Sequence, residues 1–303
     1  MTVLRITLFG ELQLARDDLL LAPHFTHTVQ TLFAYLLLQP HRAQPREVLA
    51  DILWSERSQE RARSCLSTAL WRLRRILEPD GTPVGTYLIA SPSGEISFNW
   101  QSDHWLDVSA FEVKVRQGLA RPIEILTLKE AQHLEEALQL YTGELLEGFY
   151  ADWALRERER LRGLYLNTLA HLMRFYQQQG QYDKGLVYGQ KILDLDPLRE
   201  EIHRDLMRLY VSNGQRPLAI RQYQVCCNLL AEELGITAME ETQSLYAQIA
   251  DEQMPGPISR TSDPSNVVQT LQQLRLTSRT LERAHLQVQD AIRLIERLSR
   301  HTE

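Results

Sequence analysis

The residues of this sequence that best suit chemistry with another molecule are the basic ones of a single stretch, 58–77. It reads SQERARSCLSTALWRLRRIL and holds five arginines against one glutamate, a local charge of +4 in a chain whose net charge is −6. Its apolar residues recur at spacings of three and four, which predicts a helix whose buried face is formed by Ala62, Leu66, Ala69, Leu70, Leu73, Ile76 and Leu77. The opposite face of that helix carries Arg61, Ser64, Ser67, Thr68, Trp71, Arg72 and Arg75.

Arginines and small hydroxyl groups on one helix face are suited to the phosphates and base edges of a DNA major groove. A solvated basic helix on an ordinary domain is the alternative, and the surrounding elements decide between the two. Cys65 lies near the buried edge of the helix and is predicted to be a small core residue. Trp71 falls on the arginine face, which favours a role in contacting DNA or in packing against a neighbouring hairpin.

Length and charge bound the choice of function. A chain of 303 residues with 44% hydrophobic residues is expected to form two or three packed domains. Residues 101–254 hold 16 basic and 24 acidic side chains, a net charge of −8, so nucleic-acid binding would have to be confined to a local patch. With no signal peptide, no apolar run of about 18 residues and only three cysteines, the sequence predicts a reduced, cytoplasmic protein that does not enter a membrane.

The elements around the basic helix predict its setting. Three short strands are expected at 3–9, 11–14 and 19–21. They are followed by three helices at 28–38, 46–53 and 58–77 and by a hairpin at 87–98. Ser58 is a suitable N-cap for the third helix, and Pro92 with Gly94 marks the hairpin turn. Residues 1–100 are therefore predicted to form a winged helix-turn-helix domain, in which the third helix enters the groove and the hairpin is the wing.

Three stretches in this region carry a family resemblance: LRITLFGELQL, LLLQPHRAQPREVLADILW and ALWRLRRIL. They resemble the DNA-binding domain of OmpR/PhoB-type response regulators, and the arrangement is most similar to the Streptomyces antibiotic regulatory protein family, in which this domain comes first. The resemblance implies that Arg63, Arg74 and Arg75 mostly meet phosphates. It implies that base edges are reached by Ser64, Ser67, Thr68, Trp71 and Arg72. Arg61, which lies on the same helix face, completes the predicted DNA-binding set.

Residues 101–253 are predicted to be helical throughout. Tyr176 and Gly180 are echoed by Tyr210 and Gly214 at an interval of 34 residues, which is the tetratricopeptide period. The stretch from 196 to 236 resembles the bacterial transcriptional activator domain, the second module of the same family. The family resemblance implies binding to direct DNA repeats and contact with RNA polymerase.

The sequence at the end of the chain predicts a helix that could join two copies of the chain. After a Pro/Ser/Gly linker at 254–265, residues 266–303 are predicted to form a helix with apolar residues at intervals of seven: Val267, Leu274, Leu281, Val288 and Ile295. These five are the predicted dimerisation residues, and a homodimer is the expected assembly. The alternative is a single helix that packs on the repeat domain.

Enzymatic chemistry is not indicated. The sequence has neither the phosphate-cradling Gly-x-x-x-x-Gly-Lys-Ser/Thr loop nor Gly-x-Gly-x-x-Gly, and its neighbouring histidines lack other ligands, so we expect no catalytic residue, no cofactor and no metal. The predicted fold is mainly α: a winged helix-turn-helix (α+β), an all-α tetratricopeptide-like repeat domain and a C-terminal helix. The predicted function is a sequence-specific DNA-binding transcription regulator, an activator located with the nucleoid. The alternative is a helical-repeat adaptor whose winged domain contacts protein.

Overall fold

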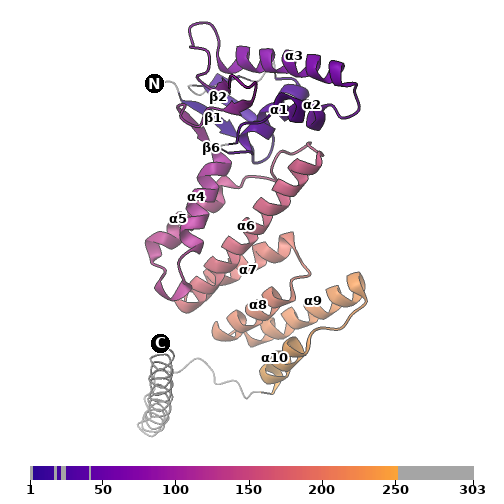
Figure 1. Cartoon of the computed structure of the whole chain (residues 1–303). Coiled ribbons are helices and arrows are strands. Elements are labelled where there is room, and N and C mark those ends of the chain that lie inside the picture. The colour runs from indigo at the N-terminus through magenta and orange to yellow at the C-terminus, as the bar shows by residue number, and fades with distance from the viewer. Residues whose placement is uncertain (1–2, 17–18, 22–24, 41, 252–303) are drawn as a thin grey trace, which may run out of the picture.

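The computed structural model of the chain describes residues 3–16, 19–21, 25–40 and 42–251. Over these residues it is mainly helical with a small N-terminal sheet, and the predicted fold class is confirmed (Figure 1). The predicted linker and the predicted dimerisation residues Val267, Leu274, Leu281, Val288 and Ile295 lie outside the described residues.

The N-terminal sheet has four strands, one more than predicted. In the order β3-β2-β1-β6 they are Leu19–Leu20, Gln13–Arg16, Leu4–Thr7 and His104–Leu106. Strands β1 and β2 pair antiparallel, whereas β6 pairs parallel to β1, with Leu4 opposite His104. Sequence analysis missed β6 because three residues are too few to show an alternating pattern. This strand comes from beyond the predicted domain boundary at residue 100.

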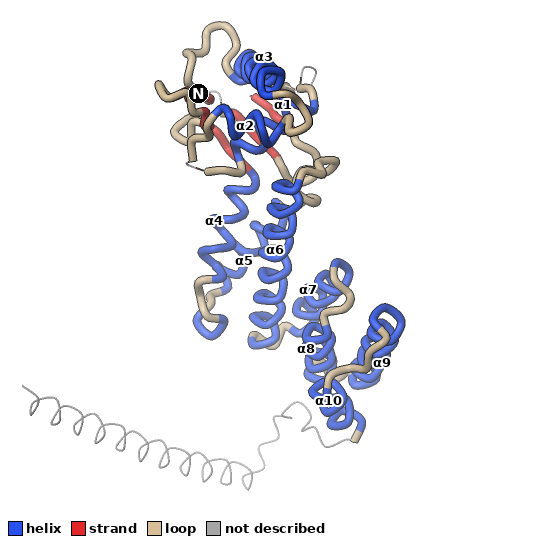
Figure 2. The backbone as a smooth tube through the Cα atoms, turned by 45° about the vertical axis from the view of Figure 1, so that its right-hand side comes forward, coloured by secondary structure: helices blue, strands red, loops and turns tan. Residues whose placement is uncertain are grey.

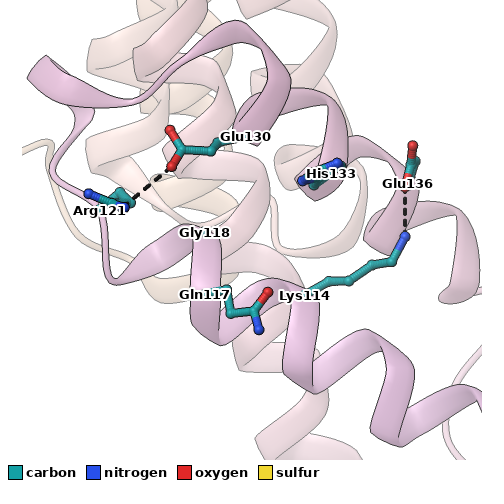
Figure 3. Close-up of a pocket in the computed structure, with 7 residues that line it drawn as sticks. All are labelled: Lys114, Gln117, Gly118, Arg121, Glu130, His133 and Glu136. Carbon is teal, nitrogen blue, oxygen red and sulfur yellow. Dashed lines mark hydrogen bonds and ion pairs between the residues drawn. The ribbon is translucent and has the colours of Figure 1, made fainter.

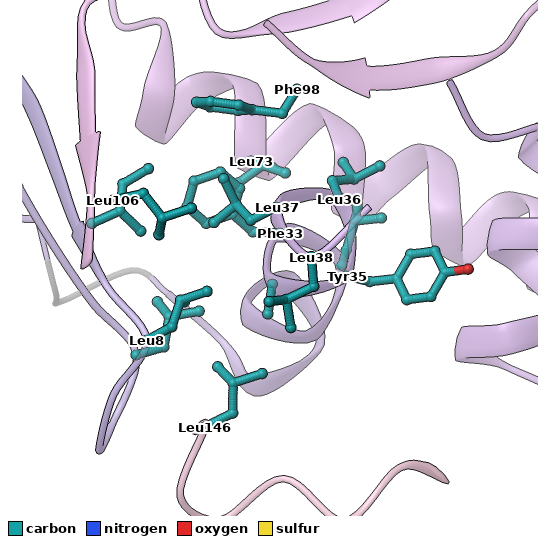
Figure 4. Close-up of a cluster of buried hydrophobic side chains, with 14 of the residues drawn as sticks. Leu8, Phe33, Tyr35, Leu36, Leu37, Leu38, Leu73, Phe98, Leu106 and Leu146 are labelled. Atoms are coloured by element: carbon teal, nitrogen blue, oxygen red, sulfur yellow. The ribbon is translucent and has the colours of Figure 1, made fainter. Parts of the chain in front are cut away.

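The sheet, three helices and the hairpin enclose the first part of the core. The helices are α1 (His27–Leu37), α2 (Arg46–Leu53) and α3 (Gln59–Leu77), and the hairpin strands are β4 (Leu88–Ala90) and β5 (Ile96–Phe98). Phe33 of α1, Leu73 of α3 and Phe98 of β5 are all at most 2% exposed and meet in this core (Figure 4). Ser58 occupies the N-cap position of α3, as predicted, although its side chain makes no capping hydrogen bond.

The rest of the described chain is helical and runs away from the winged domain (Figure 2). The elements are α4 (Asp107–Leu119), the 3-10 turn η2 (Ile123–Ile125), α5 (Leu128–Leu140), α6 (Asp152–Gln178), α7 (Tyr182–Leu195), α8 (Glu200–Ser212), α9 (Arg216–Leu234) and α10 (Glu240–Ala250). Helices α7 and α8 cross closely at Gly189, where an added Cβ would lie 2.5 Å from a methyl carbon of Leu206. Small residues at helix crossings are what a stacked helical repeat requires.

A buried carboxylate joins the winged domain to the first helix of the repeat. Asp107, at the start of α4, is 3% exposed and accepts hydrogen bonds from the backbone N–H groups of Leu8 (2.8 Å), Phe9 (2.9 Å) and Val108 (2.7 Å). Burial raises the pKa of Asp107, and the same three hydrogen bonds oppose that shift. The carboxylate thus fixes the strand end to the helix start.

The loop between α5 and α6 completes this junction. Its Leu146 donates a backbone hydrogen bond to the carbonyl of Leu8 at 2.8 Å and buries its side chain beside Leu8 and Leu38 (Figure 4). Leu146 has a φ of 51°, a left-handed conformation that is costly for a residue with a branched side chain. Arg158 of α6 holds the loop in place by donating to the carbonyls of Leu145, Leu146 and Phe149 at 2.8 to 3.1 Å.

Candidate nucleic-acid interface

Helix α3 has the two faces that its sequence predicts. Its apolar face packs on the core, with Ala62, Leu66, Ala69, Leu70, Leu73 and Leu77 buried and Ile76 half-buried. In both views of the backbone, α3 lies on the side of the winged domain that is turned away from the helical repeat (Figures 1 and 2). Its other face is therefore open to a large ligand.

The outward face contains all but one of the residues predicted to contact DNA. The exposed ones are Arg61, Arg63, Ser64, Ser67, Thr68, Trp71, Arg72 and Arg75. Trp71 is 61% exposed, and the guanidinium of Arg75 lies over its ring at 5.6 Å from the ring centroid. The indole is thus part of the open surface and supports a neighbouring cation.

Arg74 differs from the other arginines because it is half-buried. It lies four residues after Leu70 and three before Leu77, both of which are buried, so its side chain starts at the edge of the core. Its Nε is enclosed and has no hydrogen-bond partner among the described residues. This placement is less suited to a phosphate contact than that of Arg75.

Two hydroxyl groups on this face are already hydrogen-bonded within the helix. Ser67 donates to the carbonyl of Arg63 at 3.0 Å and Thr68 donates to the carbonyl of Ser64 at 3.1 Å. This back-bonding to the residue four positions earlier is common for serine and threonine in helices. In this arrangement the Thr68 oxygen keeps its acceptor lone pairs, which suits donors on base edges.

The first turn of α2 reaches across to α3. Arg46 donates from Nη2 to Ser67 Oγ at 3.3 Å, and the carboxylate of Glu47 lies 3.6 Å from Arg63 in an exposed ion pair. Sequence analysis did not assign either residue to the interface. Both residues lie at the start of the helix that precedes the basic one, which is visible in the sequence. Only the crossing of α2 and α3 shows that their side chains reach the outward face of α3.

The predicted wing is anchored to the same turn. Gln44, just before α2, exchanges two backbone hydrogen bonds of 2.8 Å with Ile96 of β5. The hairpin tip has Gly94 at a φ of 88° and a hydrogen bond from Ser93 Oγ to the Glu95 carboxylate. The loop contains no basic residue between 87 and 99. The wing is therefore uncharged or acidic where it would approach a phosphate backbone.

A hollow elsewhere in the molecule does not resemble a ligand site. It has a volume of about 590 Å³ and lies between α4 and α5, where Gly118 allows close packing against Leu134 (Figure 3). The charges around it are paired, Lys114 with Glu136 at 2.6 Å and Arg121 with Glu130 at 3.4 Å. Since these charges compensate one another, the hollow does not favour an ionic ligand.

Among the described residues, no group of three or more His, Cys, Asp or Glu side chains is placed to hold a metal ion. None of the described helices is long and apolar enough to cross a membrane.

Similarity to known proteins identifies the helical part. The profile of the bacterial transcriptional activator domain family matches residues 106–250, from the end of β6 to the end of α10. The chain contains a bacterial transcriptional activator domain. This match confirms the resemblance of the helical part to the second module of the predicted family.

Two relatives that the sequence matches are regulatory proteins. The chain is 28% identical over 251 residues to the regulatory protein AfsR of Streptomyces coelicolor, covering 81% of this chain and 24% of AfsR. It is 25% identical over 228 residues to the transcriptional regulatory protein MoaR1 of Mycobacterium bovis, covering 75% of this chain and 73% of MoaR1. The chain thus spans about a quarter of AfsR and most of MoaR1.

The fold is shared with a solved structure. Mycobacterium tuberculosis EmbR, determined in complex with a low affinity phosphopeptide, superposes with a TM-score of 0.72 over 90% of this chain and 72% of EmbR. The two sequences are 20% identical, so the comparison shows a shared fold and nothing finer. The family match and the two relatives together confirm the resemblance to the Streptomyces antibiotic regulatory protein family.

Proposed function

We propose that this regulator binds double-stranded DNA sequence-specifically through the outward face of α3. One observation carries the proposal: a helix of a winged helix-turn-helix domain exposes arginines and hydroxyl groups on the side opposite to its core contacts. Arg61, Arg72 and Arg75 form no ion pair within the described part of the chain, so their charge is available to phosphates and bases. An adaptor that binds protein has no need for such a surface.

Activation of transcription is the second part of the proposal. The activator domain extends away from α3, which would leave its helices accessible while the winged domain lies on DNA (Figure 1). We expect the regulator to act in the cytoplasm, to bind repeated promoter half-sites and to contact RNA polymerase. A single winged domain buries a small interface, and pairing of two modules on adjacent half-sites raises affinity through effective concentration.

Selection of bound fragments from random duplex DNA tests the first part. We expect the full chain to recover a repeated motif, and Arg72→Ala to recover the same motif with weaker preference at one or two base pairs per half-site. Recovery of unrelated sequences by the full chain would contradict sequence-specific binding and favour the adaptor.

Deletion of residues 265–303 tests the expected homodimer. If the predicted heptad helix pairs two chains, sedimentation equilibrium should show a dimer for the full chain and a monomer for the truncated chain, with both folded. An unchanged oligomeric state together with a lower unfolding temperature would instead assign this segment to packing on the repeat domain.

A further inference from the structure

The loop between the basic helix and the wing is shaped only by local turns of its own. Residues 79–86 contain two prolines and two glycines, and Gly81 and Gly85 have φ values of 96° and 90°. Within the loop, Thr82 and Thr86 each donate a backbone hydrogen bond to the proline three residues earlier, at 2.9 and 3.2 Å. Because neither turn reaches α3, the place of β4 beside α3 depends on contacts outside the loop.

Glu78 makes one such contact. It follows the last residue of α3, and its Oε1 accepts hydrogen bonds from the backbone N–H groups of Tyr87 at 2.8 Å and Leu88 at 3.0 Å. Leu88 is the first residue of β4, and the side chains of Tyr87 and Leu88 are both buried. A charged acceptor binds an N–H group more strongly than a neutral one does. One carboxylate oxygen thus ties the end of the basic helix to the first strand of the wing.

Arg16 holds the same point from the N-terminal sheet. Its Nη2 donates to the carbonyl of Leu77, the last residue of α3, and its guanidinium lies over the ring of Tyr87 at 5.8 Å from the ring centroid. The last carbonyls of a helix have no partner within it and carry a partial negative charge, which a cation stabilises. Strand β2, α3 and the start of β4 therefore meet at two side chains of opposite charge.

The wing needs this link because its own charge cannot draw it to DNA. None of the residues from 87 to 99 is basic, and Glu95 near the tip is acidic. The Oε2 atom of Glu78 is enclosed by protein, so this carboxylate is turned towards the interior. Contacts that flank a recognition helix fix its register on the duplex, and base edges are read from that register. A wing that moved relative to α3 would loosen it.

We propose that Glu78 is a positioning residue of the DNA interface: it holds the wing in a fixed place against α3 and so raises the sequence preference without contacting DNA. Arg16 supports it from the sheet. This inference rests on the proposed DNA binding and adds to it a residue that acts through the wing. Non-specific binding, which depends on the arginines of α3, does not need the link.

Binding of the full chain to a selected duplex and to a scrambled duplex of equal length, at about 50 to 200 mM salt, tests the proposal. Glu78→Ala removes both the charge and the acceptor, and it should lower the ratio of the two affinities roughly three- to tenfold with an unchanged salt slope. Glu78→Gln removes the charge but keeps an oxygen that can accept from both N–H groups, so it should restore the parental ratio. Asp80→Ala removes an exposed carboxylate two residues further on and is the matched control.

Two further measurements locate the cause. Amide hydrogen exchange at Tyr87 and Leu88 should be faster in Glu78→Ala than in the parent or in Glu78→Gln, because the acceptor is lost. Thermal unfolding of each variant shows that binding is measured on folded protein. Arg16→Met keeps the aliphatic stem and loses the donor to Leu77, so it should lower the affinity ratio in the same direction, and it takes the place of Glu78→Ala if that variant is unfolded.

Three outcomes would overturn the proposal. A parental affinity ratio in Glu78→Ala, or in a folded Arg16→Met where Glu78→Ala is unfolded, would make the link a matter of folding alone. An equal fall of the ratio in Glu78→Ala and Glu78→Gln would show that the charge acts rather than the hydrogen bonds. An equal fall in the Asp80→Ala control would show the same. If the parent does not distinguish the two duplexes, the proposed function itself fails; if the parent and Glu78→Ala distinguish them equally well, only the role of Glu78 fails.

Discussion

The junction between the two parts of the chain and the outward face of α3 are built in opposite ways. At the junction, the carboxylate of Asp107 and the guanidinium of Arg158 are hydrogen-bonded to backbone groups of neighbouring loops and strands, at 2.7 to 3.1 Å. On α3, the hydroxyls of Ser67 and Thr68 bond to the helix itself, and all the arginines except the half-buried Arg74 are exposed on the outward face. Folding depends on the first group of side chains, whereas the second group is available for binding.

The difference separates two kinds of variant. Removal of a junction side chain leaves buried donors or acceptors without partners, which costs folding free energy. Removal of a side chain from the outward face of α3 leaves water in its place and alters only what the surface binds. Each of the following predictions tests this separation, from the largest expected effect to the smallest.

Asp107→Ala should have the largest effect. It would leave the N–H groups of Leu8, Phe9 and Val108 without an acceptor, and the expected loss is about 3 kcal/mol of unfolding free energy. Urea unfolding followed by circular dichroism measures the loss. Asp103→Ala, an exposed aspartate in the preceding loop, is the control and should unfold like the parent. Equal midpoints for the two variants would show that the junction does not depend on this carboxylate.

Arg158→Met should cost about 2 kcal/mol, because the carbonyls of Leu145, Leu146 and Phe149 lose their donor while the aliphatic stem is kept. The loop holding Leu146 at positive φ should become more open, which amide hydrogen exchange at Leu146 would detect. The exposed neighbour Arg156, changed to Met, is the matched control. Protection that stays at the parental level in Arg158→Met would contradict this role.

Arg72→Ala and Arg75→Ala should leave the unfolding midpoint unchanged and weaken DNA binding. For Arg72 we expect a loss of ~1–3 kcal/mol on the selected duplex and little on a scrambled one. For Arg75 the loss should be similar on both duplexes, with a salt slope lower by about one. A fall in stability without a loss of binding would show that these arginines serve folding, as the junction side chains do, and would contradict the distinction between the two regions.

Glu47→Gln should have the smallest effect and the opposite sign. The exposed carboxylate neutralises Arg63 and repels phosphates, so its removal should tighten binding about two- to threefold and steepen the salt slope. Glu124→Gln, an exposed site in the helical part, controls for the change in net charge. Weaker binding in Glu47→Gln would mean that the ion pair positions Arg63 for its contact.

The amino-acid sequence determined most of the secondary structure and the direction of the basic face. Helical spacing from Ala62 to Leu77 identified the buried side of α3, because burial of apolar side chains follows the 3.6-residue period whatever the helix packs on. Turn residues such as Gly180 and Gly214, both at positive φ, marked the limits of the repeat helices. These are local signals, so they can be read without knowing the fold.

Only the tertiary structure decided which distant residues act together. No local sequence pattern predicts that β6 pairs with β1 or that Asp107 bonds to residues 98 and 99 positions away. The same is true of the hydrogen bonds by which Arg158 holds the loop before α6. The same holds for Arg46, whose place between Gly94 and Ser67 follows from the packing of α2, α3 and the hairpin. Local spacing fixes which way a side chain faces on its own element, but the neighbour it meets depends on how the elements pack.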